Sequence, residues 1–276
     1  MTWIRKELQE LGIPPLKRFG QHFLLDEKIR HTIVATAQPT ATDRILEVGP
    51  GLGYVTAELL KHSCQVVAVE KDRTLAPHLR HKFAKYSNLT VIQGDALETG
   101  NLGCNKVVSS PPYNISSKLV LFVIQNKIDR TVLLLQNEFV QRLTANCGSR
   151  EYGRLSVILQ SRAEAKRIAK VPRTAFYPIP RVDSAIVEII PKKTPPFIAD
   201  DTIFEELVRH LFTQRKRKLN GVLTRYLREQ APRKADSILS QINFLEKRIF
   251  QMDPAELIAI SNLIAREKTL GSSLEC

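Results

Sequence analysis

The residues best suited to chemistry stand in a short string, Ser110-Pro111-Pro112-Tyr113, which closes an apolar run. Consecutive prolines fix the backbone and lack N–H groups, so the carbonyl groups there can only accept hydrogen bonds. The Ser110 hydroxyl and the Pro111 carbonyl would hold the two hydrogens of an exocyclic amine, while Tyr113 would stack on the ring. Methyl transfer to such an amine depends on in-line positioning more than on a strong base. Taken alone, the string could also be a plain Pro-Pro turn or a polyproline II docking segment.

A glycine-rich string upstream, Glu47 to Gly53, offers a site for the second reactant. Gly49, Gly51 and Gly53 permit a tight turn and a close approach of a ligand to backbone amides at the start of a helix. A nicotinamide-binding fingerprint requires G-x-G-x-x-G, but Tyr54 occupies the third glycine position here. No Gly-Lys-Ser/Thr follows, which excludes a P-loop.

Two acids follow the next apolar runs. Glu70 ends one run and could accept hydrogen bonds from both hydroxyls of a ribose; Asp95 follows the next and could accept one from an adenine amine. Acids stand where a phosphate binder would carry basic residues, so the pattern indicates an adenosine without phosphate, and S-adenosylmethionine fits. Either acid alone could equally cap a helix or lie in solvent.

The elements that must position these residues alternate between Asp43 and about Ile190. Near-continuous runs of Val, Ile and Leu predict parallel strands covered by helices on both faces, and amphipathic segments between them predict the helices. The alternation is typical of a doubly wound α/β sheet, in which ligands bind at the carboxyl ends of the strands. The predicted strands are 44–49, 65–70, 89–94, 106–110 and 130–136, and the predicted helices are 54–62, 73–85 and 116–125.

The chain is expected to contain a second, smaller domain. Apolar runs at 155–159 and 184–190 would complete the first domain (residues 1–190), the second of them as an edge strand. Residues 191–201 are rich in Pro and charge and predict a linker. Residues 202–276 have helical spacing throughout and predict an all-helical domain, with Asp253 as the N-cap of a helix that begins with proline.

Composition narrows the class of partner. The chain has 41 Lys and Arg against 28 Asp and Glu, a net charge of +13, which favours a polyanionic partner over a small-molecule enzyme with a basic surface. Scattered cysteines without a C-x-x-C pair argue against zinc or disulfides, and His78 and His81 are expected to lie in solvent on a surface helix. The apolar runs are too short to cross a bilayer and the N-terminus lacks an apolar signal core, so a cytosolic protein is expected.

A basic segment supplies a surface for that partner. Between Arg209 and Lys234 nine basic residues face a single acid, Glu229, and the densest part, Gln214 to Leu223, is compatible with a helix. A basic helix face of this kind suits phosphate contact, although such a face can also be merely solvated. The basic residues at its centre are Arg215, Lys216, Arg217 and Lys218.

A second group of prolines and aromatic residues lies at Phe176 to Ser184. Phe176 could stack on the face of the target base opposite Tyr113, at roughly 1–3 kcal/mol per stacked base. The alternative is an aromatic plug beside an edge strand.

These residues together resemble one family, the small-subunit ribosomal RNA adenine dimethyltransferases of the KsgA type. The resemblance covers most of residues 17–190, and strings such as GQHFL and YGRLSV are not general methyltransferase features. It implies a class I, Rossmann-like methyltransferase sheet with a helical C-terminal domain. The matching strings are KRFGQHFL (17–24), EVGPGLG (47–53), VVAVEKD (66–72), GDA (94–96), PPYNIS (111–116), EYGRLSV (151–157) and FYPIPRVDS (176–184).

The resemblance also implies roles by position. Cofactor contacts would come from Gln21, His22 and Leu24 near the methionine end, from Glu47, Gly49 and Gly51 at the amino-acid portion, from Glu70 at the ribose and from Asp95 at the adenine. Lys71, Ala96 and Ser110 would also contact the cofactor. The slot for the target base would comprise Ser110, Pro111, Pro112, Tyr113 and Phe176. No metal is implied. The partner would be the assembling small ribosomal subunit and its rRNA, and the protein would act as a monomer.

Two positions depart from the family pattern. Many members have asparagine at the position of Ser110 and proline at that of Lys118. Serine keeps an acceptor for the amine, but the relative ease of the first and second methylation is left open, and Lys118 is expected to contact phosphate. Two other functions stay open at this point: a methylase of large-subunit rRNA, and a non-catalytic nucleic-acid-binding or assembly factor on the same fold.

Overall fold

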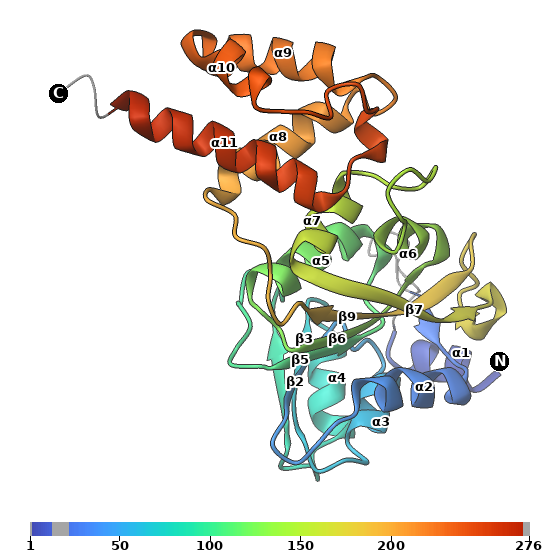
Figure 1. Ribbon diagram of the computed structural model, residues 1–276. Helices are drawn as coiled ribbons and strands as arrows, with labels where there is room; N and C mark the ends of the chain where they lie inside the picture. Colours follow the sequence, from blue (N-terminus) through green and yellow to red (C-terminus); the bar gives the residue numbers. More distant parts are fainter. Residues whose placement is uncertain (1, 13–21, 273–276) are drawn as a thin grey trace. The chain divides into compact units, whose positions relative to one another are not determined.

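The computed structural model describes residues 2–12 and 22–272 (Figure 1). The chain forms two compact units, one from Met1–Gln141 and Glu164–Pro191 and the other from Arg142–Ala163 and Lys192–Cys276. The unit boundary at Pro191 lies beside the boundary expected at residue 190. The segment Arg142–Ala163 was expected in the first domain and instead packs within the second unit.

The first unit is built on a mixed sheet. Within the described residues it contains seven strands in the order β4-β3-β2-β5-β6-β9-β7. The pairs β2–β3, β3–β4, β2–β5 and β5–β6 are parallel, and β6 pairs antiparallel with β9. The doubly wound α/β fold expected from the sequence is confirmed. The strands are β2 (Arg44–Val48), β3 (Gln65–Glu70), β4 (Leu89–Gln93), β5 (Lys106–Ser109), β6 (Arg130–Gln136), β7 (Ala163–Val171) and β9 (Ser184–Pro191).

Helices cover both faces of this sheet, which explains the continuous apolar strands. Figure 1 shows α2, α3 and α4 on one face and α5 on the other. The short strands β1 (Phe23–Leu24) and β8 (Phe176–Tyr177) form a separate antiparallel pair. The helices of this unit are α1 (Thr2–Glu10), α2 (Glu27–Ala37), α3 (Tyr54–Leu59), α4 (Leu75–Lys82) and α5 (Ser116–Gln125), followed by α6 (Asn137–Leu143) at the boundary between the units.

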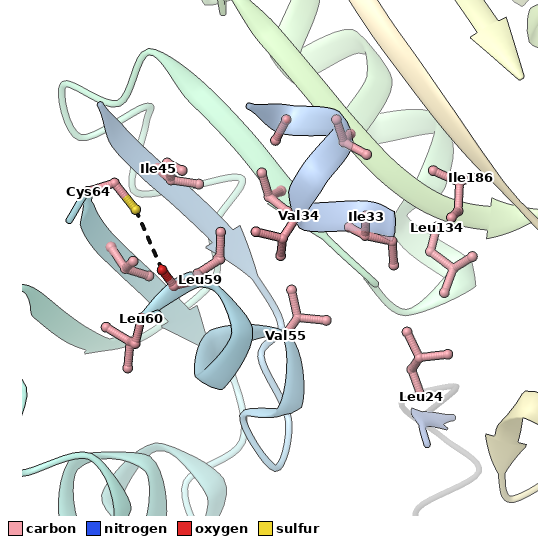
Figure 2. Packing of buried hydrophobic residues seen from close by; sticks show 14 of the residues in the cluster. Leu24, Ile33, Val34, Ile45, Val55, Leu59, Leu60, Cys64, Leu134 and Ile186 are labelled. Atoms are coloured by element: carbon pink, nitrogen blue, oxygen red, sulfur yellow. Dashed lines mark hydrogen bonds between the residues drawn. The ribbon is translucent and has the colours of Figure 1, made fainter. Parts of the chain in front are cut away.

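The core beneath α2, α3 and α4 fixes the strands that carry the site. Figure 2 shows Ile33 and Val34 of α2 and Val55 and Leu59 of α3 in one buried cluster with the sheet residues Ile45 and Leu134. The Cys64 thiol of the turn before β3 donates to the Leu59 carbonyl at 3.8 Å, as the dashed line marks. These side chains are almost fully buried, and full burial of such a side chain contributes about 1.5–3 kcal/mol.

One prediction for the late part of the sheet was wrong. β9 lies between β6 and β7 rather than at the edge, and the outer strand is β7. The run at 155–159, which was expected to complete the first domain, lies in a helix of the second unit, α7 (Arg154–Arg162). At its start the Gly153 N–H donates to the Ser156 hydroxyl at 3.0 Å, and Ser156 donates to the Arg142 carbonyl at 2.5 Å.

The second unit is helical, as expected. Asp253 caps α11 as the sequence predicts: the Glu256 N–H donates to Asp253 Oδ1 at 2.9 Å, and Glu256 Oε2 accepts from the Asp253 N–H at 3.1 Å. Asp200 caps α8 through the Ile203 N–H at 2.9 Å. After α7 the helices of this unit are α8 (Asp201–Phe212), α9 (Leu219–Gln230), α10 (Ala235–Ser240) and α11 (Pro254–Ser272). Across residues 2–12 and 22–272, no helix has the length and apolar character needed to cross a membrane.

Candidate active site

A cavity of about 330 Å³ opens at the carboxyl ends of β2, β3, β4 and β5. The strand order reverses between β2 and β5, and open α/β sheets bind ligands at that point. Every expected catalytic and cofactor residue except Gln21 lines this cavity, and Gln21 lies outside the described residues. These lining residues are His22, Leu24, Glu47, Gly49, Gly51, Glu70, Lys71, Asp95, Ala96, Ser110, Pro111, Pro112, Tyr113 and Phe176.

The glycine-rich turn after β2 contacts the proline motif after β5. Gly49 and Gly51 have φ angles of 67° and 62°, in the left-handed region that favours glycine. A Cβ atom on Gly49 would lie 3.1 Å from Pro112 Cδ, and one on Gly51 would lie 3.1 Å from Phe23 Cε1. The absence of side chains therefore lets the two motifs meet and leaves the turn open toward the cavity.

The Glu70 carboxylate organises the backbone of that turn. Its Oε2 accepts from the Gly51 N–H at 2.9 Å, and its Oε1 accepts from the Asp72 N–H at 2.9 Å. Burial raises the pKa of Glu70 above its usual value. Each carboxylate oxygen retains acceptor capacity, so both ribose hydroxyls could still bind there.

Asp95 stands at the end of β4 under the influence of two lysines. Lys71 Nζ donates to Asp95 Oδ2 at 2.9 Å, and the Leu97 N–H donates to Oδ1 at 3.0 Å. The bond from Lys71 lowers the pKa of Asp95 below its usual value, and the charge of Lys118 acts in the same direction. Lys118, in α5, is exposed, and its charge reaches Asp95.

Glu47 lies fully buried at the base of the cavity. Thr56 Oγ1 donates to its Oε2 at 2.6 Å. Burial, with a smaller contribution from the charge of Glu70, raises the pKa of Glu47 to about 8. A ligand that brings a positive charge would stabilise the ionised form. The amino-acid portion of S-adenosylmethionine has such a charge.

The proline motif ends β5 and presents its aromatic residue to the cavity. Ser109 Oγ donates to the Val48 carbonyl at 2.5 Å and so joins the ends of β5 and β2. Tyr113 begins a short 3₁₀ turn, and its hydroxyl forms a 2.7 Å hydrogen bond with the Ser184 hydroxyl. Burial raises the pKa of Tyr113, which keeps the hydroxyl protonated.

His22 and Phe176 line the same cavity as Tyr113. The imidazole of His22 stacks on Tyr113 with ring centroids 5.6 Å apart and an interplanar angle of 30°. Its Nδ1 lies 2.7 Å from the Pro178 carbonyl and must carry the proton, because a carbonyl only accepts. Phe176 lines the cavity but is only 1% exposed, so its ring is part of the core as well as of the wall.

Sequence reasoning missed several residues of the site. Tyr54, Asp72 and Phe23 line the cavity. Ser109 joins the ends of two strands beside it through its hydrogen bond to the Val48 carbonyl. Tyr54 had a signal, since it replaces the third glycine of a nicotinamide fingerprint. The role of Ser109 depends on a backbone carbonyl of another strand, which no local pattern reveals.

Leu219 to Leu223 begin α9, but the centre of the basic segment, Arg215 to Lys218, is not the helix face that its composition suggested. Residues 213–217 form the turn between α8 and α9, and Lys218 precedes α9. The Ile249 and Phe250 N–H groups donate to the Arg217 and Arg215 carbonyls at 3.1 Å and 3.0 Å, so tertiary pairing replaces helical bonding.

The four basic side chains of this turn differ in their contacts. Arg215 donates to the Arg150 and Ser149 carbonyls at 2.7 Å and 3.0 Å and lies over the Phe250 ring, which indicates a structural role. Lys218 pairs with Glu246 at 2.6 Å. Lys216 and Arg217 are exposed.

The histidines of α4 are not equivalent. His78 was expected in solvent, but it is partly buried with Nε2 3.5 Å from Glu7 Oε1, and burial lowers its pKa. His81 is exposed, as expected. In the described part of the chain, His, Cys, Asp and Glu side chains form no group of three or more that could hold a metal ion.

The donor set fits S-adenosylmethionine on chemical grounds. Two carboxylates, Glu70 and Asp95, stand at successive strand ends where hydroxyl and amine groups of an adenosine would need acceptors. The glycine turn leaves room for a ligand against the backbone, and Glu47 is a buried acid suited to an ammonium group.

Comparison with known proteins identifies the family. The family model "Ribosomal RNA adenine dimethylase" matches residues 16–265. A protein of Pyrococcus abyssi, "Probable ribosomal RNA small subunit methyltransferase A", is 36% identical over 271 residues, which is 96% of this chain and 97% of that protein. A protein of the same name from Methanosarcina mazei is 36% identical over 249 residues, or 89% of this chain and 92% of that protein.

Solved structures agree in fold. The dimethyladenosine transferase of Plasmodium falciparum superposes with a TM-score of 0.76 at 25% identity, over 87% of this chain and 96% of that chain. The 23S rRNA methyltransferase ErmE gives a TM-score of 0.67 at 26% identity, over 87% and 98%. The chain belongs to the ribosomal RNA adenine dimethylase family.

Proposed function

We propose that this protein transfers methyl groups from S-adenosylmethionine to N6 of two adjacent adenosines in the hairpin near the 3′ end of small-subunit rRNA. The observation that carries the proposal is the shared cavity in which the glycine turn, Glu70 and Asp95 face the Ser110–Tyr113 motif. The names of the curated relatives, which specify the small subunit, support the choice of substrate.

The cofactor end of the cavity is proposed to work by acceptance of hydrogen bonds and by charge. Glu70 receives the ribose hydroxyls and Asp95 the adenine amine, while ionised Glu47 faces the ammonium group. Bound there, the cofactor supplies an electrophilic methyl group on a sulfonium. Lys71, Ala96, His22 and Leu24 complete the walls of this end.

The acceptor end is proposed to position the target amine. Ser110 Oγ and the Pro111 carbonyl accept from the N6 hydrogens, and Pro112 fixes the backbone between them and Tyr113. The face of Tyr113 that is not covered by His22 stacks on the base, and Phe176 packs at its border. The N6–C bond forms as the C–S bond breaks, and the N6 proton passes to solvent, so no strong base is required.

The rRNA is proposed to contact exposed basic side chains. Lys216 and Arg217 in the turn before α9, and Lys118 in α5, stand free to approach phosphates. Arg215 and Lys218 already bind protein groups, so they would contribute to the positive electrostatic potential rather than contact phosphates directly. We further propose that the protein acts as a monomer, in the cytoplasm, on the assembling small subunit.

A second candidate is methylation of large-subunit rRNA, which the similarity to ErmE favours. The test is incubation of the protein and labelled S-adenosylmethionine with under-methylated small subunits and, separately, with large subunits. Label on the small subunit alone supports the proposal. Label on the large subunit alone favours the second candidate, and cofactor binding without label on either favours a non-catalytic assembly factor.

A further inference from the structure

The N-terminal helix α1 forms part of the wall behind the cavity. Its apolar residues Ile4 and Leu8 are buried in a cluster with Phe23, Leu52 and Leu75. Phe23 lines the cavity, and Leu52 belongs to the glycine-rich turn. A helix far from the reacting groups in sequence is therefore packed against the backbone that the cofactor would approach.

Glu7 gives α1 a polar contact with this wall. The Tyr54 hydroxyl donates to Glu7 Oε2 at 2.6 Å, and Lys82 Nζ donates to Oε1 at 2.8 Å. Lys82 Nζ also donates to the Leu52 carbonyl at 2.9 Å. Lys82 thus connects the Glu7 carboxylate directly to the glycine-rich turn.

Glu7 is ionised in this setting. Burial raises its pKa, but the hydrogen bonds from Lys82 and Tyr54 outweigh burial, and the net pKa lies below the usual value. Burial and the neighbouring carboxylate raise the pKa of Tyr54, so its hydroxyl stays a donor. The pair is a charge-assisted hydrogen bond, the stronger class of such bonds.

Tyr54 is the side chain that this arrangement holds in place. It lines the cavity at the first residue of α3, directly after the glycine turn. Two cations lie over its ring, with Arg30 Cζ at 5.5 Å and Lys82 Nζ at 5.1 Å from the ring centroid. At the position of the third glycine of a dinucleotide-binding fingerprint, this chain has Tyr54, whose hydroxyl is held by the Glu7 carboxylate.

We propose that Glu7 is a positioning residue for S-adenosylmethionine, acting through Tyr54 and Lys82 to fix the cavity wall and the glycine-rich turn. The inference rests on the proposed function in one respect, namely that this cavity holds the cofactor. Glu7 touches neither reactant in this arrangement. Its loss should weaken cofactor binding and leave the transfer step intact once the cofactor is bound.

The test compares Glu7→Gln, Tyr54→Phe and the double variant in the full-length protein. The control is Glu10→Gln on the same helix, an exposed acid 3.8 Å from exposed Lys6. Calorimetric titration gives the Kd for S-adenosylmethionine, and turnover on under-methylated small subunits gives kcat and KM. Thermal unfolding of each variant checks that it stays folded.

We expect Glu7→Gln to raise the Kd and the KM for S-adenosylmethionine about tenfold, which corresponds to roughly 1.4 kcal/mol. At saturating cofactor kcat should stay within about twofold, because the transfer step itself is untouched. Tyr54→Phe should raise the same constants by a smaller factor. The double variant should bind no more weakly than Glu7→Gln alone, because the two residues act through one hydrogen bond. Glu10→Gln should match the wild type.

Other results would overturn the inference. If Glu7→Gln and Tyr54→Phe lower the melting temperature while the Kd stays at the wild-type value, Glu7 only stabilises the fold. If Glu7→Gln does not fold, an unchanged Kd in Tyr54→Phe leads to the same conclusion. Failure of the wild type to bind S-adenosylmethionine would instead contradict the proposed function, so the two failures are distinguishable.

Discussion

Gly53, the last glycine of the turn, is the position where a single added methyl group tests the packing most sharply. Its φ angle is 81°, and a Cβ atom there would lie 2.5 Å from Phe83 Cε2 and 2.7 Å from Leu79 Cδ2. Real Cβ atoms essentially never approach closer than 3.0 Å, so Gly53→Ala must displace residues of and next to α4. Because the glycine turn and α4 are joined there, the change should weaken both the fold and the site.

The size of the effect follows from two separate terms. A left-handed backbone at a non-glycine residue costs about 1–2 kcal/mol. Overpacking of a filled core costs about 1–3 kcal/mol. The free energy of unfolding of Gly53→Ala should therefore fall by roughly 2–5 kcal/mol.

Gly100→Ala is the matched control, because both glycines have a left-handed backbone but only a Cβ atom at Gly53 would collide with neighbouring side chains. Gly100 lies in the same unit with a φ angle of 73°, and a Cβ atom there would meet nothing within 4 Å. Thermal unfolding of both variants should give a loss for Gly100→Ala of about 1–2 kcal/mol from strain alone. The excess in Gly53→Ala, about 1–3 kcal/mol, should lower the melting temperature by about 2–4 °C for each kcal/mol. Equal losses in the two variants would refute the packing argument.

Three further predictions concern ionisable groups. Asp43 is buried, and burial raises its pKa, but hydrogen bonds from Lys106, Asn105 and Thr40 outweigh burial and hold the pKa at about 2. The ionised carboxylate should therefore add about 2 kcal/mol to the free energy of unfolding above pH 3.8, and this contribution is lost as the pH falls through 2. Asp43→Asn should remove this dependence of stability on pH when unfolding is measured at acid pH. An unchanged loss of stability between pH 3.8 and 2 would contradict the prediction. Glu47 has the opposite sign: its pKa is raised to about 8, so the ligand-free protein should lose stability as pH rises from 4.5 through 8, and cofactor binding near pH 7 should release a proton. Calorimetry in buffers of different ionisation enthalpy measures that release, and its persistence in Glu47→Gln would assign it to another group. In the second unit, Lys216→Ala and Arg217→Ala should each reduce the slope of log Kd for rRNA against log salt concentration by about one, without loss of stability. Arg215→Ala should instead lower the melting temperature, because it leaves the Ser149 and Arg150 carbonyls unpaired. The reverse pattern would contradict the contacts described.

The sequence predicts the parallel half of the sheet well because those strands are buried on both faces. The strand β7 escaped notice because Ala163–Val171 alternates polar and small residues, as an outer strand with one solvated face does. The apolar run in α7 was ambiguous for the opposite reason, since burial makes a short helix look like a strand.

Most of the candidate site could be predicted because its residues stand at strand ends, where parallel topology brings them together. Contacts between distant segments could not. The Glu7–Tyr54 bond joins residues 47 positions apart. The basic turn at Arg215 depends on backbone pairing with Phe250, and charge composition alone is equally compatible with a helix.

The most direct test of the central claim is mass mapping of small-subunit rRNA after incubation of immature, under-methylated subunits with the protein and S-adenosylmethionine. The proposed function predicts two adjacent N6,N6-dimethyladenosines in the hairpin near the 3′ end. It also predicts that they are absent after reaction with Tyr113→Ala, although that variant still binds the cofactor, because the target base has lost its stacking partner. Unmodified adenosines after reaction with a wild-type protein that binds S-adenosylmethionine normally would contradict it.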